Sequence, residues 1–187
     1  MRDDPLSPNL EAEPPHLALS VRQPWAWAIF NGKDVENRTA QAVNSGKMEP
    51  RRICIHAAKG MTRDEYEHSR EFMASIGVEC PAPAKLVRGA ILGTVDVAAI
   101  VKEHASKWFF GPRGLVLEDP FLWSEPCPCV GSLGFFELGE EGGYPIRGQI
   151  DQPKPWMTNW SPDGEPPILS RRAARRPKPL PLFGESA

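Results

Sequence analysis

The chain has 187 residues with 41% hydrophobic content, which is enough to bury the core of one domain with extensions. Its 22 basic and 24 acidic residues give a net charge of −2, which argues against a protein that coats long nucleic-acid duplexes, because such proteins need an excess of positive charge. No apolar run approaches the roughly 20 residues needed to cross a bilayer, and the acidic N-terminus lacks the pattern of a signal peptide, so the expected location is the cytoplasm.

The two ends of the chain differ in composition from its middle. Residues 1–15 contain four prolines and four acidic residues, which predicts a disordered arm. The folded domain is predicted to span residues 16–138. Residues 139–187 are rich in proline and arginine and predict a tail that is either flexible or draped on the domain.

The domain is predicted to begin with a strand and a short helix. Residues 17–21 alternate large apolar side chains with small or polar ones, as a half-buried strand does. Pro24 suits the first position of a helix and Gly32 suits the left-handed residue that ends one, so a helix of about eight residues is expected between them. Trp25 falls on its inner face, whereas Trp27 lies about 200° away and is expected to be more exposed.

The next segments predict a loop, a strand and a second helix. Residues 39–52 predict a loop of about 14 residues, which is long enough to be a lid or a binding loop. Residues 53–58 predict a core strand whose side chains alternate between two faces. Thr62 and Glu65 form a capping box that begins a helix, and Gly77 ends it.

Strands dominate the remainder of the domain. Three more are predicted, at residues 90–100, 115–118 and 132–138. In the first of them, Ile91 is expected to share a face with Val95 and Val97. Because strands outnumber helices and the connections are mostly short, we predict an α+β fold: a closed or nearly closed mixed β-barrel with two or so flanking helices.

The tail combines two features. Trp156 and Trp160 are four residues apart and are expected to fold back onto the barrel, because large aromatic side chains are seldom left in water. Residues 171–182 hold four arginines and one lysine, which can contact RNA or a protein partner. A solvated, flexible end is the simpler alternative.

Four segments, in order along the chain, resemble the ASCH domain family, which belongs to the PUA-like superfamily of small RNA-associated β-barrels. They are Ser20–Ala26, Gly32–Arg38, Ile53–Gly60 and Gly131–Glu137. The resemblance covers residues 17–138. It implies a PUA-like β-barrel and a role connected with RNA or nucleotides.

The segment after the first helix is the main candidate for chemistry. It places Lys33, Asp34, Glu36 and Arg38 within six residues, next to an apolar body that can partly desolvate them. Lys33 is predicted to act as a general base or to donate to an oxyanion, with Glu36 or His56 handling the second proton. A structural ion pair between Glu36 and Arg38 is an equal alternative for that carboxylate.

The resemblance also bears on these residues. Relatives of the ASCH group that hydrolyse acylated cytidine have a lysine at the position of Lys33 and use a nearby threonine and a downstream glutamate. Here Glu36 stands at the threonine position, which removes the hydroxyl nucleophile, and no residue matches the downstream glutamate. The resemblance therefore implies a site at Lys33 but disfavours direct transfer of that deacylase mechanism.

A second group of residues is predicted to bind the ligand in a cleft between the Pro24 helix and the barrel. Cationic, amide, aromatic and hydroxyl side chains can contact phosphates, base edges or base faces. The predicted binding residues are Arg22, Gln23, Trp27, Asn37, Arg38, Lys59 and Ser132. Trp25 is expected to be a core residue instead, and a histidine such as His56 is often bonded to a structural partner.

No metal and no cofactor are predicted. Cys54 and His56, with Cys127 and Cys129, offer four groups of the types that zinc binds, but neither pair has the spacing of a zinc knuckle. The predicted function is recognition of RNA or of a nucleotide-like ligand, with the possibility of a metal-independent hydrolase acting on RNA. A non-catalytic module that binds RNA or a modified base and a deacylase of acylated cytidine are the alternatives.

Overall fold

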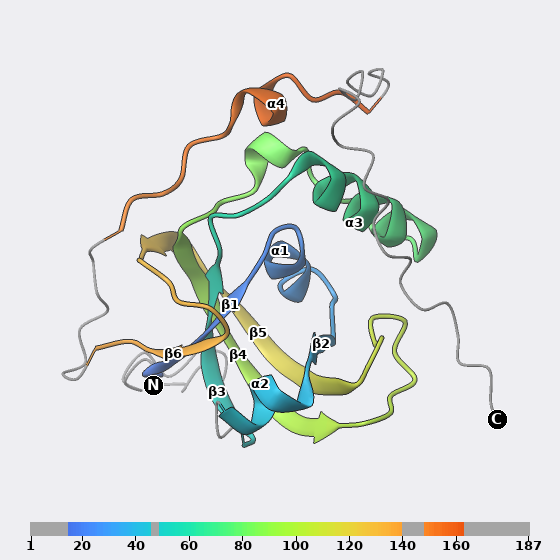
Figure 1. Ribbon diagram of the computed structural model, residues 1–187, viewed down its shortest axis with the longest axis vertical. Coiled ribbons are helices and arrows are strands. Elements are labelled where there is room, and N and C mark those ends of the chain that lie inside the picture. Colours follow the sequence, from blue (N-terminus) through green and yellow to red (C-terminus); the bar gives the residue numbers. More distant parts are fainter. Residues whose placement is uncertain (1–14, 46–48, 140–147, 163–187) are drawn as a thin grey trace, which may run out of the picture.

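The computed structural model describes residues 15–45, 49–139 and 148–162 of the chain (Figure 1). Its strands are β1 (Leu17–Val21), β2 (Val35–Arg38), β3 (Arg51–Ala57), β4 (Ala90–Val101), β5 (Arg113–Pro128) and β6 (Phe135–Glu137). Its helices are α1 (Trp25–Ile29), α2 (Ala40–Ser45), α3 (Arg63–Ser75), the short 3₁₀ helix η1 (Pro83–Lys85) and α4 (Pro155–Thr158). The predicted arm, apart from Pro15, and the arginine-rich end of the tail lie outside the described residues.

The strands form one curled sheet with the order β2-β5-β4-β3-β1-β6, so that β2 and β6 are its edges. β1 pairs in parallel with β3, and the other pairs are antiparallel. Figure 1 shows this sheet as a half-barrel, with α1 at one end of the curl and α3 beyond it. The predicted class, a mixed α+β fold with a barrel-like sheet and few helices, is confirmed at this level.

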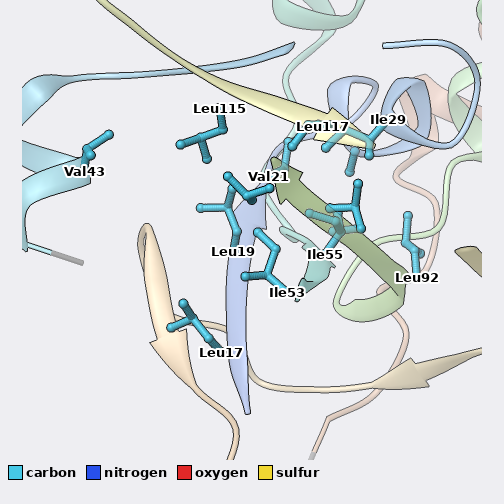
Figure 2. Close-up of a cluster of buried hydrophobic side chains, with 14 residues drawn as sticks. Leu17, Leu19, Val21, Ile29, Val43, Ile53, Ile55, Leu92, Leu115 and Leu117 are labelled. Atoms are coloured by element: carbon cyan, nitrogen blue, oxygen red, sulfur yellow. The ribbon is translucent and has the colours of Figure 1, made fainter. Parts of the chain in front are cut away.

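The concave face of the sheet carries the largest hydrophobic cluster. Figure 2 shows side chains from β1, β3, β4 and β5 converging there, joined by Ile29 from α1 and Val43 from α2. Leu19, Ile53 and Ile55 are fully buried in this cluster because each strand turns every second side chain inward. Charged groups that reach the same face are therefore far from bulk water and must find partners.

The predicted long loop at residues 39–52 is wrong, because α2 and the start of β3 occupy much of it. Thr39 explains the helix: its Oγ1 accepts a hydrogen bond from the Ala42 amide at 3.1 Å, as a helix-capping side chain does. Val43 then anchors α2 to the core.

The predicted faces of β4 are also wrong at one position. Leu92, rather than Ile91, shares the inner cluster with Val95 and Val97, while Ile91 packs outside. The pairing of β4 with β5 shifts register between Ile91 and Gly93 and again before Asp96, so the strict alternation of a flat strand does not hold.

Local signals at helix ends are confirmed. Thr62 and Glu65 make the reciprocal capping box of α3, and Gly77 follows that helix with φ of +86°. Gly32 has φ of +97°, which ends the first helical segment as predicted, although α1 has only five residues.

Two strands differ in length from their predictions. β5 has 16 residues, far more than the predicted 115–118, and it includes three prolines at positions 120, 126 and 128. β6 is shorter than predicted and covers residues 135–137. Within the described residues, no helix combines the length and the apolar character needed to span a bilayer.

The described part of the tail packs on the domain. Trp156 and Trp160 both contact the ring of Tyr66 in α3, with centroids 6.2 and 5.2 Å away, so they fold back as predicted, but onto this helix and not onto the barrel. The buried guanidinium of Arg88 holds the same segment through Asp151 at 2.9 Å and the Gln152 carbonyl at 2.7 Å. This segment is therefore tied to the domain by both aromatic packing and a buried arginine.

Candidate ligand-binding site

The turn between α1 and β2 directs three charged side chains toward one place. Gly32 reverses the chain, and the Lys33 amide then donates to the Ala28 carbonyl at 2.9 Å. In the β2–β5 ladder Glu36 lies opposite Leu115, so its side chain shares the face of that core residue. Arg38, two residues on, follows on the same face.

These three side chains form one ion-paired group, which we call the Lys33–Glu36–Arg38 trio. Glu36 Oε2 accepts from Lys33 Nζ, and Glu36 Oε1 accepts from Arg38 Nη2 at 3.0 Å. The side chains of Lys33 and Glu36 are 2% and 7% exposed, whereas that of Arg38 is 21% exposed. One carboxylate thus serves two cations, and Arg38 is the member of the trio that solvent reaches most.

The carboxylate of Glu36 is held in its charged form by its two partners. Burial would raise the pKa of Glu36, but attraction to Lys33 and Arg38 outweighs this and holds the pKa below its ordinary value. Burial lowers the pKa of the Lys33 ammonium, and the attraction of Glu36 only partly offsets this. The trio therefore carries a net charge of +1 in a largely buried place when all three groups are charged.

Arg38 links the β2 edge of the sheet to β1. Its Nη2 also donates to the Ser20 carbonyl at 3.2 Å, and the Ser20 amide donates at 2.9 Å to the carbonyl of Gly134, the residue directly before β6. A side chain, rather than strand pairing, thus joins the two sides of the curled sheet here. Among the described residues Arg38 Nε is buried without a hydrogen-bond partner, so the guanidinium is only partly satisfied.

Next to this contact, β1 and β3 bring a serine and a histidine together. The parallel register sets Ser20 opposite His56, and Ser20 Oγ lies 2.9 Å from His56 Nδ1. His56 Nε2 lies 3.3 Å from the Cys129 carbonyl, which can only accept, so Nε2 carries the hydrogen and Nδ1 accepts from the Ser20 hydroxyl. Burial lowers the pKa of His56, which favours this neutral form.

Neither set of contacts is explained by a known relative: no protein-family model matches the chain, and no curated protein matches its sequence. The chemistry of the site therefore has to be inferred from its geometry. Sequence reasoning had selected Lys33, Glu36, Arg38 and His56, which the structure links through Ser20. It missed Ser20 as a functional group, because only the register of the parallel strands pairs it with His56.

Two other predicted cations lie at the ends of the parallel strands. Arg22 follows β1, pairs with Glu65 of α3 at 2.6 Å and donates to the Gly60 carbonyl at 3.1 Å. Lys59 is exposed just after β3. Ser132 is exposed in the segment that precedes β6. All three residues lie at the surface, and none of their described contacts involves the trio.

The amide and indole groups predicted to contact bases have structural contacts instead. Gln23 is buried, donates to the Val87 carbonyl at 2.7 Å and accepts from the Trp27 amide at 2.9 Å. Asn37 donates to the Trp108 carbonyl and accepts from the Phe110 amide, both at 2.7 Å. The Trp27 ring is partly buried between two hydrophobic clusters. Base recognition by these three residues stays a prediction that their described contacts do not favour.

The thiols do not gather into a metal site. Across the three described stretches, no group of three or more histidine, cysteine or acidic side chains is arranged to hold a metal ion. Burial raises the pKa of Cys129 and of Cys127, which favours their neutral thiols over the thiolates that zinc binds.

Proposed function

We propose that this protein is a cytoplasmic, PUA-like β-barrel of the ASCH type that binds a short RNA or a nucleotide-like ligand at the Lys33–Glu36–Arg38 trio. The observation that carries the proposal is the shared carboxylate. Glu36 neutralises one of two cations, so one positive charge is left at Arg38, the more exposed member. A phosphate or a carbonyl oxygen of a ligand is the natural partner for such a guanidinium.

The charge balance of the domain limits the size of that ligand. Residues 17–138 contain 14 basic and 14 acidic side chains, so the domain has no net positive charge with which to follow a long backbone. Binding through one or two phosphates gives a weak dependence on salt, in contrast to proteins that neutralise many. A short single strand, a chain end or a free nucleotide fits this balance best.

Arg38→Gln tests the binding proposal. The variant should bind a short fluorescein-labelled single-stranded RNA at least about tenfold more weakly than the wild type, because a charge-assisted hydrogen bond is lost. The slope of log affinity against log salt should also fall by about 0.7 for each phosphate contact removed. Fluorescence anisotropy measures both quantities.

Arg63→Gln is the matched control for that experiment. Arg63 pairs with Glu67 within α3 at 2.6 Å, so its loss removes an equal charge away from the trio. Its affinity should stay within about twofold of the wild type, since surface ion pairs contribute little. Equal weakening by both variants, or no measurable binding by the wild type, would contradict a site at Arg38.

A metal-independent hydrolase acting on RNA is the second candidate. It is favoured by the burial of Lys33, which lowers the pKa of its ammonium and makes a neutral amine more accessible as a base. Two facts oppose it: Glu36 pairs with the ammonium, and the Lys33 side chain is 2% exposed. A substrate reaches this amine only if the groups that bury it move.

Lys33→Met separates this candidate from simple binding. If this candidate is correct, chelator-treated wild type fragments a mixed RNA pool, and the variant leaves the pool intact while still binding RNA, because the Glu36–Arg38 pair remains. Intact-mass spectrometry detects fragments ending in phosphate, and pool members with acylated cytidine report a deacylase by loss of the acyl mass alone. Lys85→Met, at an exposed lysine, is the control. Unchanged masses with wild-type protein would exclude both hydrolases.

A further inference from the structure

The contact between Ser20 and His56 has the form of an activated hydroxyl. We propose that Ser20 is a nucleophile that forms an acyl-serine intermediate with carboxylic esters, with His56 as its general base. This activity goes beyond the binding of RNA or nucleotides and does not depend on it.

Three groups stand in the order that nucleophilic catalysis requires: a hydroxyl, a base and a group that orients the base. Ser20 Oγ is 2.9 Å from His56 Nδ1, within the range for proton transfer. On the other side of the ring, the Cys129 carbonyl accepts from Nε2 and so holds the imidazole in the tautomer whose Nδ1 is free to take a proton. Ser20 is partly exposed while His56 is buried, so a substrate approaches the pair from the side of the Ser20 hydroxyl.

The imidazole is also held in place by packing. A Cβ added to Gly131 would overlap Cε1 and Nδ1 of the ring and come within 2.8 Å of Nε2, so the backbone there lies directly against it. The Phe136 ring meets the imidazole edge to face, with centroids 5.6 Å apart. Leu133, two residues after Gly131, is 98% exposed, which places this histidine directly beneath a surface segment. A fixed base close to solvent is what an acyl-transfer site needs.

The reaction balances with water as the only co-reactant. Ser20 Oγ bonds to the ester carbonyl carbon as its proton passes to His56 Nδ1. The bond from that carbon to the leaving oxygen then breaks, and Nδ1 returns the proton to the alcohol that departs. A water molecule attacks the acyl-serine with His56 again as base, which releases the carboxylic acid and restores the Ser20 hydroxyl.

Arg38 indicates the kind of ester. Its Nη2 donates to the Ser20 main-chain carbonyl at 3.2 Å, so the surplus positive charge of the trio contacts the backbone of the nucleophilic residue. An ester whose acyl part carries a carboxylate or another anionic group is favoured over a neutral one by this charge. The 4-nitrophenyl monoester of succinic acid should therefore be turned over faster than the butyrate ester, and Arg38→Gln should remove the difference.

A fluorophosphonate probe tests the nucleophile directly. Its phosphorus is attacked by an activated serine, fluoride leaves, and a stable phosphonate ester adds a known mass. We expect one probe per chain, located on Ser20 by peptide mapping, and no labelling at this position in Ser20→Ala. His56→Gln should slow the labelling by about 100-fold or more, the usual contribution of a general base. Ser124→Ala, at an exposed serine of β5, should label as the wild type does.

The dependence of the labelling rate on pH keeps the proposal testable if His56→Gln does not fold. In the wild type the labelling rate should rise with pH as His56 loses its proton, and it should become constant from a pH below the ordinary histidine pKa of 6.5. Burial and the nearby Lys59 lower the pKa of His56, and the Cys129 contact only partly opposes this. An unactivated serine would instead react in proportion to hydroxide over the whole range. No label, a label elsewhere, or that proportional rise would overturn the proposal. The probe contains no nucleotide, so either outcome leaves RNA binding to be decided separately.

Discussion

Glu36→Gln should lower the free energy of unfolding by about 3–5 kcal/mol, the usual cost of removing one partner from a buried ion pair. The reason is that Lys33 and Arg38 would then face a neutral amide in a place where Lys33 is 2% exposed. Gln retains the size of the side chain, so the loss is one of charge and not of packing. Urea unfolding followed by tryptophan fluorescence measures the effect.

A double-mutant cycle with Lys33→Met identifies its cause. If buried positive charge is responsible, removing the ammonium as well should restore stability, and the double variant should exceed Glu36→Gln by about 1–2 kcal/mol. If the stability losses of the two single variants instead add up to the loss of the double variant, Lys33 and Glu36 do not interact. A loss below about 1 kcal/mol in Glu36→Gln would contradict the geometry of the trio.

The stability lost in Glu36→Gln should depend on pH. Because the pKa of Glu36 is lower in the folded chain than its ordinary value of 4.5, its stabilising contribution is complete above that value. The contribution is lost as the pH falls through the lowered pKa of the folded state. The difference in stability between wild type and Glu36→Gln should therefore be largest near neutral pH and should shrink in acid.

Gly131→Ala is expected to have the second large effect. The added methyl group would occupy the space of the His56 ring, and neither that buried ring nor the backbone of the segment can yield without losing contacts. Overpacking of this kind costs about 1–3 kcal/mol. A displaced imidazole would also lose its hydrogen bond with the Ser20 hydroxyl. The rate at which the fluorophosphonate labels Ser20 should therefore fall by a larger factor than the equilibrium constant for folding does.

Gly60→Ala provides the matched control. Its Cβ would meet the end of the Arg22 side chain at 3.0 Å, and that exposed group can move aside at little cost. Its stability and its Ser20 labelling should both stay near those of the wild type. If Gly131→Ala were equally mild in thermal unfolding and in labelling, the close packing of this backbone on His56 would be refuted.

Features that depend on neighbours in sequence could be predicted from the sequence. The capping box of Thr62 and Glu65 and the glycine ends at Gly32 and Gly77 need only a few adjacent residues, and each formed as predicted. The pairing of Glu36 with Arg38 is local and was one of the two predicted alternatives; the contact of Lys33 with Glu36 is also local but was not predicted. The alternation of β1 and β3 identified the residues that these two strands contribute to the core.

Errors arose where distant segments decide the outcome. Gly93 permits a close approach of β5 to β4, because a Cβ there would overlap the Phe121 carbonyl oxygen, and the irregular pairing around it sends Leu92 inward instead of Ile91. The structural contacts of Asn37 were also not predicted, because its side-chain nitrogen and oxygen bond to residues 108–110, more than 70 positions away; its contact with a ligand stays a prediction. Neither the irregular pairing of β4 nor the partners of Asn37 can be inferred from the residues next to them in the sequence.

The sequence by itself determined the helix ends, the strand-rich composition and the cluster of charges from Lys33 to Arg38, because short-range sterics and hydrogen bonds act between neighbours in the chain. The tertiary structure decided which of those charges meet and what they adjoin. Ser20 and His56 are 36 residues apart and become partners only through the register of two parallel strands. That register is set by the burial of the whole inner face, since a shift of one residue would turn every apolar side chain of β1 outward.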